Sequence, residues 1–227
     1  TTESLADVGT YIGEVYFWRA WFYFNLMKRF GDLPWYNTPL GTNSEELYAP
    51  RISRSIIADS ILSDLDHAIN LLTPVNQSIP QRIHKDVAVA FKARVALYEG
   101  SWEKYHNGTP FGVSNANYNK YFQIAADAAQ TLINSGYYNI AAGSNPGWDY
   151  WSLFNQRDLS GNREVIFWRK YDLSQGLTHN GQAMLLLEGG NTGLSKQLVD
   201  DYLCKDGLPV SLSPLYLGDD SIARVIT

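Results

Sequence analysis

Residues 18–36 read WRAWFYFNLMKRFGDLPWY, and this segment combines a helix, its stop signal and an aromatic loop. At 3.6 residues per turn the helix, which begins upstream, presents two neighbouring apolar stripes. These stripes consist of Val15, Trp18, Phe22 and Leu26, and of Tyr16, Ala20, Tyr23, Met27 and Phe30. Phe17, Trp21 and Phe24 fill most of the remaining circumference. The pattern predicts a helix that other helices enclose on nearly every side.

A membrane span is the competing interpretation of this apolar run. Arg19 and Asn25 interrupt it, and the uninterrupted part is too short for a bilayer core of roughly 30 Å. We therefore interpret the run as a core helix. Because an unpaired buried charge is costly, Arg19 then needs an ion-pair partner or a neighbouring ring on which to stack.

The end of this helix is marked by local signals. Gly31 suits the left-handed position after the last helical turn, and two basic residues in that turn complement the helix dipole. Pro34 prevents the helix from resuming. The chain is therefore expected to leave the core at Asp32 and to present Trp35 and Tyr36 in a loop.

Composition limits the classes of function. The chain has 227 residues, enough for one large domain or two small ones, and its formal charge is -5 with no basic tract. We therefore expect no nucleic-acid partner. The single cysteine, Cys204, excludes an internal disulfide. Since Thr1 is no start residue and the chain stops at Thr227 within an open segment, we expect a fragment with both ends missing.

Four helices follow from the apolar period and its boundary signals. They cover approximately residues 5–30, 54–72, 85–102 and 118–135. Ser53 is the expected N-cap of the second helix, Pro74 lies beyond its end, and Gly136 ends the fourth. The expected buried stripe of the second helix is Ile57, Ile61, Leu65, Ala68 and Leu72, and that of the third is Val87, Ala90, Phe91, Arg94 and Leu97.

Segments 66–72 and 127–133 share an Asp, an Ala and a pair of aliphatic residues, which indicates repeated helical hairpins. Tetratricopeptide repeats stack such hairpins with small residues at the crossing points. The predicted fold is therefore mainly α, a tetratricopeptide-like helical-hairpin scaffold with long loops and a few short β-strands.

Residues 1–136 form the predicted helical scaffold, and residues 137–227 a loop-rich part of the same domain, incomplete at its C-terminus. Within this part, residues 164–171 alternate and are rich in β formers, so they predict a strand. An irregular stretch, residues 172–193, precedes a short helix over 195–204 that Ser195 is expected to cap. A structureless stretch of this length in a compact domain is usually either functional or a mistaken assignment of elements, and we interpret this one as functional.

The sequence offers little support for catalysis, and we expect no cofactor and no metal site. It contains no phosphate-binding glycine loop, and its four histidines lie too far apart to form a helical zinc site. Segment 158–164 has oxygen side chains at alternate positions but lacks the glycine of a calcium loop, so a surface turn is favoured. Acids that a glycosidase could pair are Asp32, Glu45, Glu46, Asp149 and Asp158.

Aromatic residues make up 14% of the chain, including 15 Tyr and 7 Trp, against 18% charged residues. This composition is common on surfaces that meet sugars, whose C–H faces stack on rings, but rings also fill cores.

Several motifs in a fixed order resemble the SusD/RagB family. They are Arg19-Ala20 through Phe30-Gly31-Asp32-Leu33-Pro34, Arg54, Ser63-Asp64-Leu65-Asp66-His67-Ala68, Lys85-Asp86-Val87-Ala88 to Ala93-Arg94-Val95-Ala96-Leu97-Tyr98, Tyr150-Trp151-Ser152-Leu153-Phe154, Glu164-Val165-Ile166-Phe167, and Leu198-Val199-Asp200-Asp201-Tyr202 followed by Asp206-Gly207. The resemblance implies a glycan-binding, non-enzymatic lipoprotein on the outer-membrane surface, held by a lipid anchor outside this chain. Its implied partners are an oligosaccharide or polysaccharide and a TonB-dependent transporter that imports the glycan.

The family pattern fixes scaffold positions better than binding positions. Within it, Trp151, Phe154, Ile166 and Phe167 are expected to be packing residues. The predicted ligand-binding residues are Trp35 and Tyr36, where the pattern varies, and Gln175, His179, Asn180 and Gln182 in the loop after residue 172. Two alternatives stay open: a helical-repeat scaffold that binds protein and no sugar, and an α-helical glycoside hydrolase.

Overall fold

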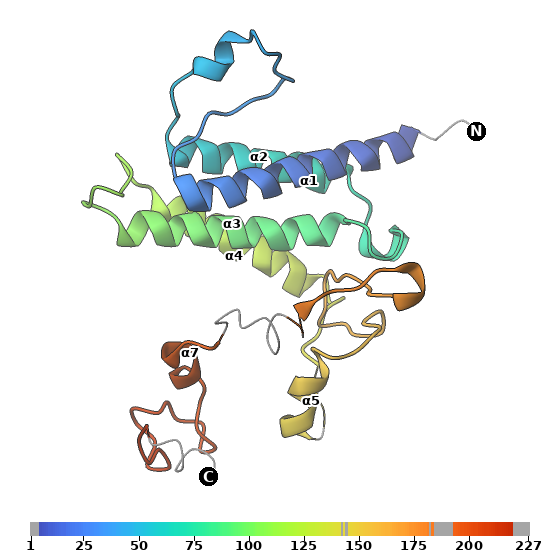
Figure 1. Cartoon of the computed structure of the whole chain (residues 1–227), viewed down its shortest axis with the longest axis vertical. Coiled ribbons are helices and arrows are strands. Elements are labelled where there is room, and N and C mark those ends of the chain that lie inside the picture. Colours follow the sequence, from blue (N-terminus) through green and yellow to red (C-terminus); the bar gives the residue numbers. More distant parts are fainter. Residues whose placement is uncertain (1–4, 142, 144, 182, 184–192, 220–227) are drawn as a thin grey trace. The chain divides into compact units, whose positions relative to one another are not determined.

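A computed structural model describes residues 5–141, 143, 145–181, 183 and 193–219 (Figure 1). The chain divides into two compact units, residues 1–170 and 171–227, each of which is described by itself. The first unit contains α1 (Leu5–Phe30), η1 (Glu45–Tyr48), α2 (Arg54–Leu71), η2 (Val75–Gln77), α3 (Lys85–Tyr105), α4 (Tyr118–Asn134) and α5 (Pro146–Ser152). The described part of the second unit contains η3 (Leu173–Gln175) and α7 (Lys196–Asp200). The predicted change of character after Gly136 falls within the first unit.

Helices α1 to α4 pack in sequence order, each against the next, as two successive helical hairpins (Figure 1). This confirms the mainly α, tetratricopeptide-like prediction. Small residues stand at the crossing points. A Cβ added at Gly13 would lie 3.0 Å from Cγ of Leu72, and one at Gly100 would lie 2.8 Å from Cδ1 of Phe122. These glycines therefore allow α1 to approach the end of α2, and α3 to approach α4, more closely than any side chain would permit.

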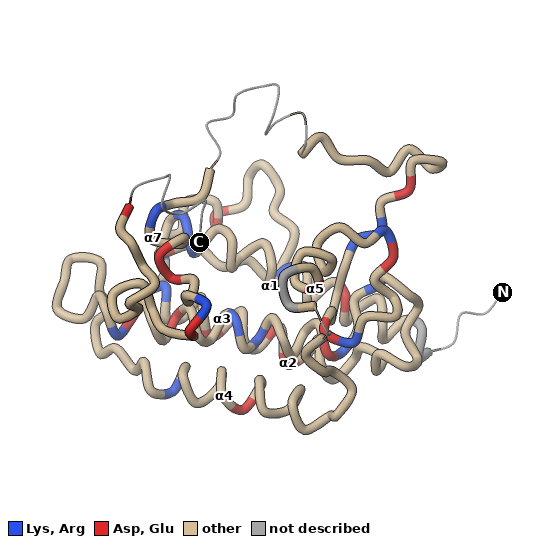
Figure 2. The backbone as a smooth tube through the Cα atoms, turned by 90° about the horizontal axis from the view of Figure 1, so that it is seen from below, with Lys and Arg blue, Asp and Glu red and all other residues tan. Residues whose placement is uncertain are grey.

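The core lies between the hairpins and includes the whole predicted stripe of the second helix. Ile57, Ile61, Leu65 and Ala68 are fully buried, and Leu72 is nearly so. Charged residues of both signs are interspersed along the helices, as Figure 2 shows. Residues outside the core therefore offer no long run of a single charge along α1 to α4.

The prediction that other helices enclose α1 on nearly every side is wrong, and of its two predicted stripes only Ala20 and Met27 are buried. Phe17, Ala20, Phe24 and Met27 form the buried stripe, whereas Val15, Trp18, Phe22 and Leu26 are exposed. Phe24 is 3% exposed and contacts the rings of Phe91 and Tyr98 on α3, at centroid distances of 5.5 and 5.4 Å. Because α2 and α3 cover one side of α1 in the described residues, the helix is not enclosed, and its outer face stays apolar and open.

Two further predictions about faces and strands are wrong. Arg94 and Leu97 on α3 are exposed, and their expected place in the core is taken by Val95, Ala96 and two acids. Residues 164–171 form no strand, and the described β structure is limited to the isolated bridges Leu33–Ile52 and Asp172–Leu177. In segment 164–171 the carbonyl of Ile166 bonds a histidine ring rather than a neighbouring strand.

The helix boundaries follow the predicted signals closely. Gly31 has φ of +70° and donates its N–H to the Met27 carbonyl at 2.9 Å, which ends α1. Ser53 occupies the predicted N-cap of α2, but its side chain makes no cap hydrogen bond. Instead Asp32 Oδ1 accepts the N–H of Arg54 at 2.9 Å. The carboxylate at the end of α1 therefore caps the start of α2.

A buried ion pair joins the two hairpins. Arg54, 5% exposed, donates to both carboxylate oxygens of Glu99, and its Nη2 lies 2.7 Å from Oε2. Its guanidinium also lies over the ring of Trp102, 4.1 Å from the centroid. Burial raises the pKa of Glu99, and the hydrogen bonds from Arg54 oppose that rise. Glu103, also buried, accepts the N–H of Asn117 at 2.6 Å.

Candidate functional site

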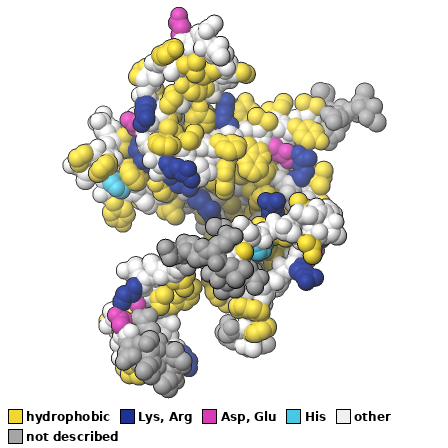
Figure 3. Space-filling model, viewed as in Figure 1, with side chains coloured by type: hydrophobic (Ala, Val, Ile, Leu, Met, Phe, Trp, Pro, Cys, Tyr) yellow, Lys and Arg dark blue, Asp and Glu magenta, His cyan; other side chains and the backbone are white. Residues whose placement is uncertain are grey.

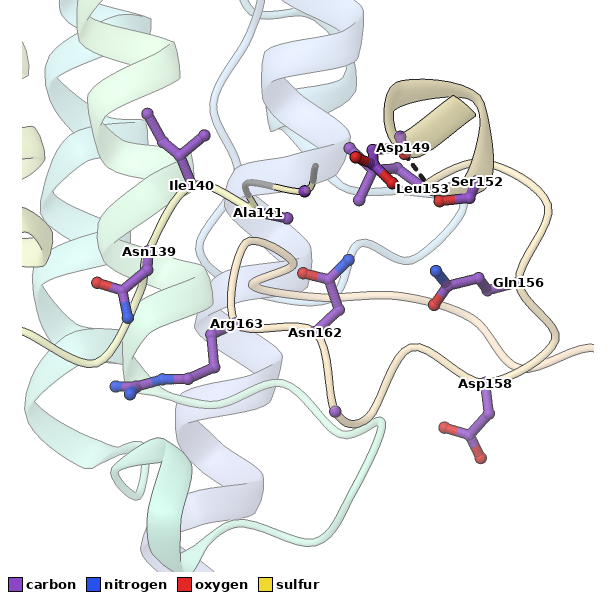
Figure 4. Close-up of a pocket in the computed structure, with 12 residues that line it drawn as sticks. Asn139, Ile140, Ala141, Asp149, Ser152, Leu153, Gln156, Asp158, Asn162 and Arg163 are labelled. Atoms are coloured by element: carbon purple, nitrogen blue, oxygen red, sulfur yellow. Dashed lines mark hydrogen bonds between the residues drawn. The ribbon is translucent and has the colours of Figure 1, made fainter. Parts of the chain in front are cut away.

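A cavity of about 430 Å³ opens among the loops that follow α4 (Figure 4). Its walls come from segment 139–143, from α5 and from segment 153–163. Figure 4 shows the amides of Gln156 and Asn162 on one segment, with Asp149 and Ser152 of α5 opposite them. The lining thus includes four side chains that both donate and accept hydrogen bonds, namely Asn139, Ser152, Gln156 and Asn162.

Part of this lining is structural. Arg163 donates to the carbonyls of Gly136 and Tyr137, at 2.9 and 2.5 Å, and so ties the segment after α4 to the wall of the cavity. Asn162 Oδ1 accepts the N–H of Glu164 at 2.9 Å. The side chains of Asn139 and Gln156, by contrast, are exposed and unpartnered among the described residues. These two amides are available to a ligand.

A second cavity of about 410 Å³ shares Asp158, Asn162 and Arg163 with the first. Its other walls include rings, namely Tyr137, Tyr138, Phe167 and Trp168. Tyr138 is held in place because its hydroxyl donates to Asp86 at 2.9 Å. The Trp168 ring makes no ring contact in the described part of the chain. The adjoining cavities thus combine amides with aromatic faces.

More exposed rings lie on α5 and just after it. Trp148, Tyr150, Trp151 and Phe154 are each more than half exposed. The prediction that Trp151, Phe154 and Phe167 are packing residues is therefore wrong for the described structure, because these residues are 52%, 74% and 43% exposed. The same prediction is confirmed for Ile166, which packs against the core.

The acids of the first cavity, Asp149 and Asp158, accept hydrogen bonds from the backbone and do not have the features of a catalytic acid. Asp149 Oδ2 accepts the N–H of Asn145 at 2.8 Å. Hydrogen bonds from Ser160 hold the pKa of Asp158 below its ordinary value. A glycosidase acid needs a raised pKa instead. Asp32, another candidate acid, caps α2.

His84 forms the buried back wall of the second cavity. It is 5% exposed, its Nε2 lies 3.1 Å from the Ile166 carbonyl oxygen, and its Nδ1 has no partner in the described residues. The backbone contact fits a neutral ring that donates from Nε2. Burial lowers the pKa of His84, although the Ile166 carbonyl and Asp86 oppose this effect.

Acid is expected to destabilise the protein through His84. Since its folded-state pKa lies below the ordinary value of about 6.5, His84 binds a proton in the unfolded chain at a pH where it stays neutral in the folded chain. The free energy of unfolding should therefore fall as the pH drops from about 7 to 5, and His84→Gln should flatten this fall. Urea denaturation at a series of pH values measures both slopes, and equal slopes would contradict the assignment.

Trp35 and Tyr36 are half-buried against α1 rather than free in a loop. The Trp35 ring lies 4.1 Å from that of Tyr23, and its Nε1 donates to Asn37 at 2.8 Å. The Tyr36 hydroxyl donates to the carbonyl of Glu46 at 3.2 Å. Both residues stay predicted ligand contacts, with their polar atoms already engaged.

Arg19 behaves as the sequence predicts. Its Nε and Nη2 donate to the two oxygens of Asp64, each at 2.6 Å. Its guanidinium also lies over the rings of Tyr16 and Trp35, at 5.4 and 5.2 Å from their centroids. The expected ion pair and stack are confirmed, and this arginine serves the scaffold.

The remaining predicted contacts belong to the second unit. Gln175 ends η3, and the imidazole of His179 accepts the N–H of Gly181 at 3.2 Å. Asn180 is exposed, and Gln182 lies outside the described residues. The predicted ligand-binding residues are thus divided between the two units. In the second unit Ser195 caps α7 as predicted, by accepting the N–H of Leu198, but the helix ends at Asp200.

No helix in the described ranges is both long and apolar enough to cross a membrane. Across the same residues, no three His, Cys, Asp or Glu side chains gather closely enough to hold a metal ion.

These features define a class of protein: a helical-hairpin scaffold that carries a loop-built polar and aromatic surface. A SusD-like family described as "Starch-binding associating with outer membrane" matches residues 2–97. The SusD-like proteins P38 and P2 of Formosa agariphila are 33% identical over 93 residues and 27% identical over 156 residues. They cover 41% and 63% of this chain, which spans 18% and 30% of their length.

Solved structures agree with this match. The crystal structure of a SusD-like protein from Bacteroides fragilis has a TM-score of 0.56 and 25% identity, and it covers 73% of this chain and 28% of its own. The family match over residues 2–97, the curated relatives and the shared fold show that this chain is similar to SusD-like proteins.

Proposed function

We propose that this chain belongs to a cell-surface lipoprotein that captures oligosaccharides for a TonB-dependent outer-membrane transporter and does not cleave them. The observation that carries the proposal is the pair of adjoining cavities after α4, where free amides lie beside unstacked rings. The family description, which names starch binding and the outer membrane, supports the same function and location.

The chemistry of the two cavities suits a sugar. Sugar hydroxyls both donate and accept, and the free amides of Asn139 and Gln156 can do the same. The apolar C–H face of a pyranose can lie on the Trp168 ring. Because Asp149 and Asp158 are already hydrogen-bonded, capture is favoured over hydrolysis at this surface.

A helical-repeat scaffold without sugar binding is the second candidate, and one observation favours it. The outer face of α1 exposes Val15 and Phe22 by 68% and 64%. Exposed apolar faces of this kind are common at protein contacts. A docked transporter would use such a face in addition to a sugar site, so the two functions are compatible.

Isothermal titration of the intact protein with neutral malto-oligosaccharides and xylogluco-oligosaccharides tests the proposal. Trp168→Ala and Gln156→Ala should each weaken binding roughly threefold to tenfold, since each removes one ring contact or one hydrogen bond. Trp35→Ala and Tyr36→Ala test the contacts that the sequence predicts. Gln123→Ala, at an exposed position on α4, is the matched control and should leave affinity unchanged.

Absence of binding across a broad neutral and acidic panel would contradict the proposal and favour the protein scaffold. Release of reducing ends from any bound oligosaccharide, lost in Asp149→Asn or Asp158→Asn, would favour a hydrolase instead.

A further inference from the structure

A third cavity, of about 920 Å³, lies at the C-terminal end of α1, away from the loops after α4 in the sequence. Segments 28–32, 51–56 and 110–114 line it together with Trp102. Its volume is within the range of pockets that take small molecules. Figure 3 shows Lys and Arg side chains gathered over this end of the helical layer.

Three cations that line this cavity have no acidic partner. Lys28, Arg29 and Arg51 are exposed, and none forms an ion pair or a side-chain hydrogen bond in the described part of the chain. Arg19, Arg54, Arg82 and Lys120, by contrast, are all paired with acids. Three cations without an acidic partner thus line one cavity in a chain whose formal charge is -5, and Nζ of Lys28 also lies 4.8 Å from the centroid of the Phe24 ring.

The local structure accounts for only part of this charge. Lys28 and Arg29 complement the dipole at the end of α1. Arg51 comes from another segment, before α2, and no such role applies to it. Among the described lining residues Asp32 is the sole acid, and its carboxylate is committed to the N–H of Arg54. The cavity therefore keeps a net positive charge.

The rest of the lining suits a sugar ring. Phe30 and Phe111 are 56% and 69% exposed, and neither ring stacks on another in the described residues. The Trp102 ring is already covered, because the Arg54 guanidinium lies 4.1 Å from its centroid and the His106 ring stacks on it at 3.9 Å. The hydroxyls of Ser53 and Ser114 add polar contacts.

We propose that this cavity binds an acidic saccharide, with Arg29, Arg51 and Lys28 pairing with its carboxylate or sulfate group and Phe30 or Phe111 facing its ring. Guanidinium groups match the planar geometry of such anions. The inference rests on the proposed glycan-binding function and extends it to a second site with its own ligand class.

Titration of the intact protein with oligogalacturonate, its methyl ester and a sulfated carrageenan oligosaccharide tests this site. The double variant Arg29→Gln, Arg51→Gln should weaken binding of a charged oligosaccharide about tenfold or more, with neutral malto-oligosaccharide affinity unchanged. Arg94→Gln removes an exposed, unpartnered arginine outside the cavity and is the matched control. Comparison of the affinities for oligogalacturonate and for the sulfated carrageenan oligosaccharide identifies whether carboxylate or sulfate is preferred.

Equal binding of oligogalacturonate and its methyl ester would overturn the proposal, as would unchanged affinity of the double variant for both charged ligands. Equally tight binding of inorganic sulfate alone would also overturn it, because the sugar ring would then contribute nothing. If neutral oligosaccharides still bind in any of these cases, the proposed glycan-binding function of the two cavities after α4 is unaffected. If the wild-type protein binds neither neutral nor charged oligosaccharides, the proposed glycan-binding function is rejected as well.

Discussion

Arg54→Met is expected to lower the free energy of unfolding by about 3–5 kcal/mol. The substitution leaves the Glu99 carboxylate fully buried without the guanidinium that donates to both of its oxygens. A buried carboxylate without a partner must either be desolvated as an anion or take up a proton. Urea denaturation at pH 7, followed by circular dichroism, measures the change.

The double variant Arg54→Met, Glu99→Met separates the stability of the pair from the penalty of an orphaned charge. Replacing a whole buried ion pair with apolar residues is often nearly neutral. We therefore expect the double variant to recover most of the stability that the single variant loses. If it is as unstable as Arg54→Met, the loss reflects the stack of Arg54 on Trp102 rather than the unpaired buried charge of Glu99.

Phe24→Ala is expected to destabilise the protein by about 3–5 kcal/mol, and Phe22→Ala by no more than about 0.5 kcal/mol. The two residues lie on the same helix, but Phe24 is 3% exposed and Phe22 is 64% exposed. Truncation of Phe24 leaves a cavity beside Phe91 and Tyr98, whereas truncation of Phe22 leaves none.

The pair is its own matched control, because both variants make the same chemical change in the same helix. Urea denaturation of the intact protein gives both values. Equal destabilisation would mean that further polypeptide covers the outer face of α1, and a reversed order would contradict the assignment of its buried face.

Local signals explain why the helix ends could be predicted. The turn at Gly31, the stop at Pro34 and the start after Ser53 depend on the backbone preferences of a few neighbouring residues. The buried face of α1 depends instead on which partners are present. An all-round apolar helix carries no periodic mark that tells one face from another.

Non-local partners also explain what the sequence missed in the core and at the site. Burial of Glu99 is tolerable only because Arg54 reaches it from α2. Segment 164–171 has β-forming residues, but a strand needs a neighbour that the described residues do not supply. Asn139 and Gln156 line the same cavity through loops that Arg163 joins by hydrogen bonds to Gly136 and Tyr137. The concentration of amides in these loops was the available signal.

The junction of α1 and α2 has a consequence for how such proteins diversify. Asp32 caps Arg54, and next to this contact Leu33 and Ile52 exchange two backbone hydrogen bonds, at 3.2 and 3.0 Å. The intervening loop is thus pinned at its base, so insertions within it need not displace either helix. Doubling the length of a flexible loop adds only about 0.6 kcal/mol of closure entropy. Evolution can therefore lengthen or replace this loop while the hairpin beneath it keeps its geometry.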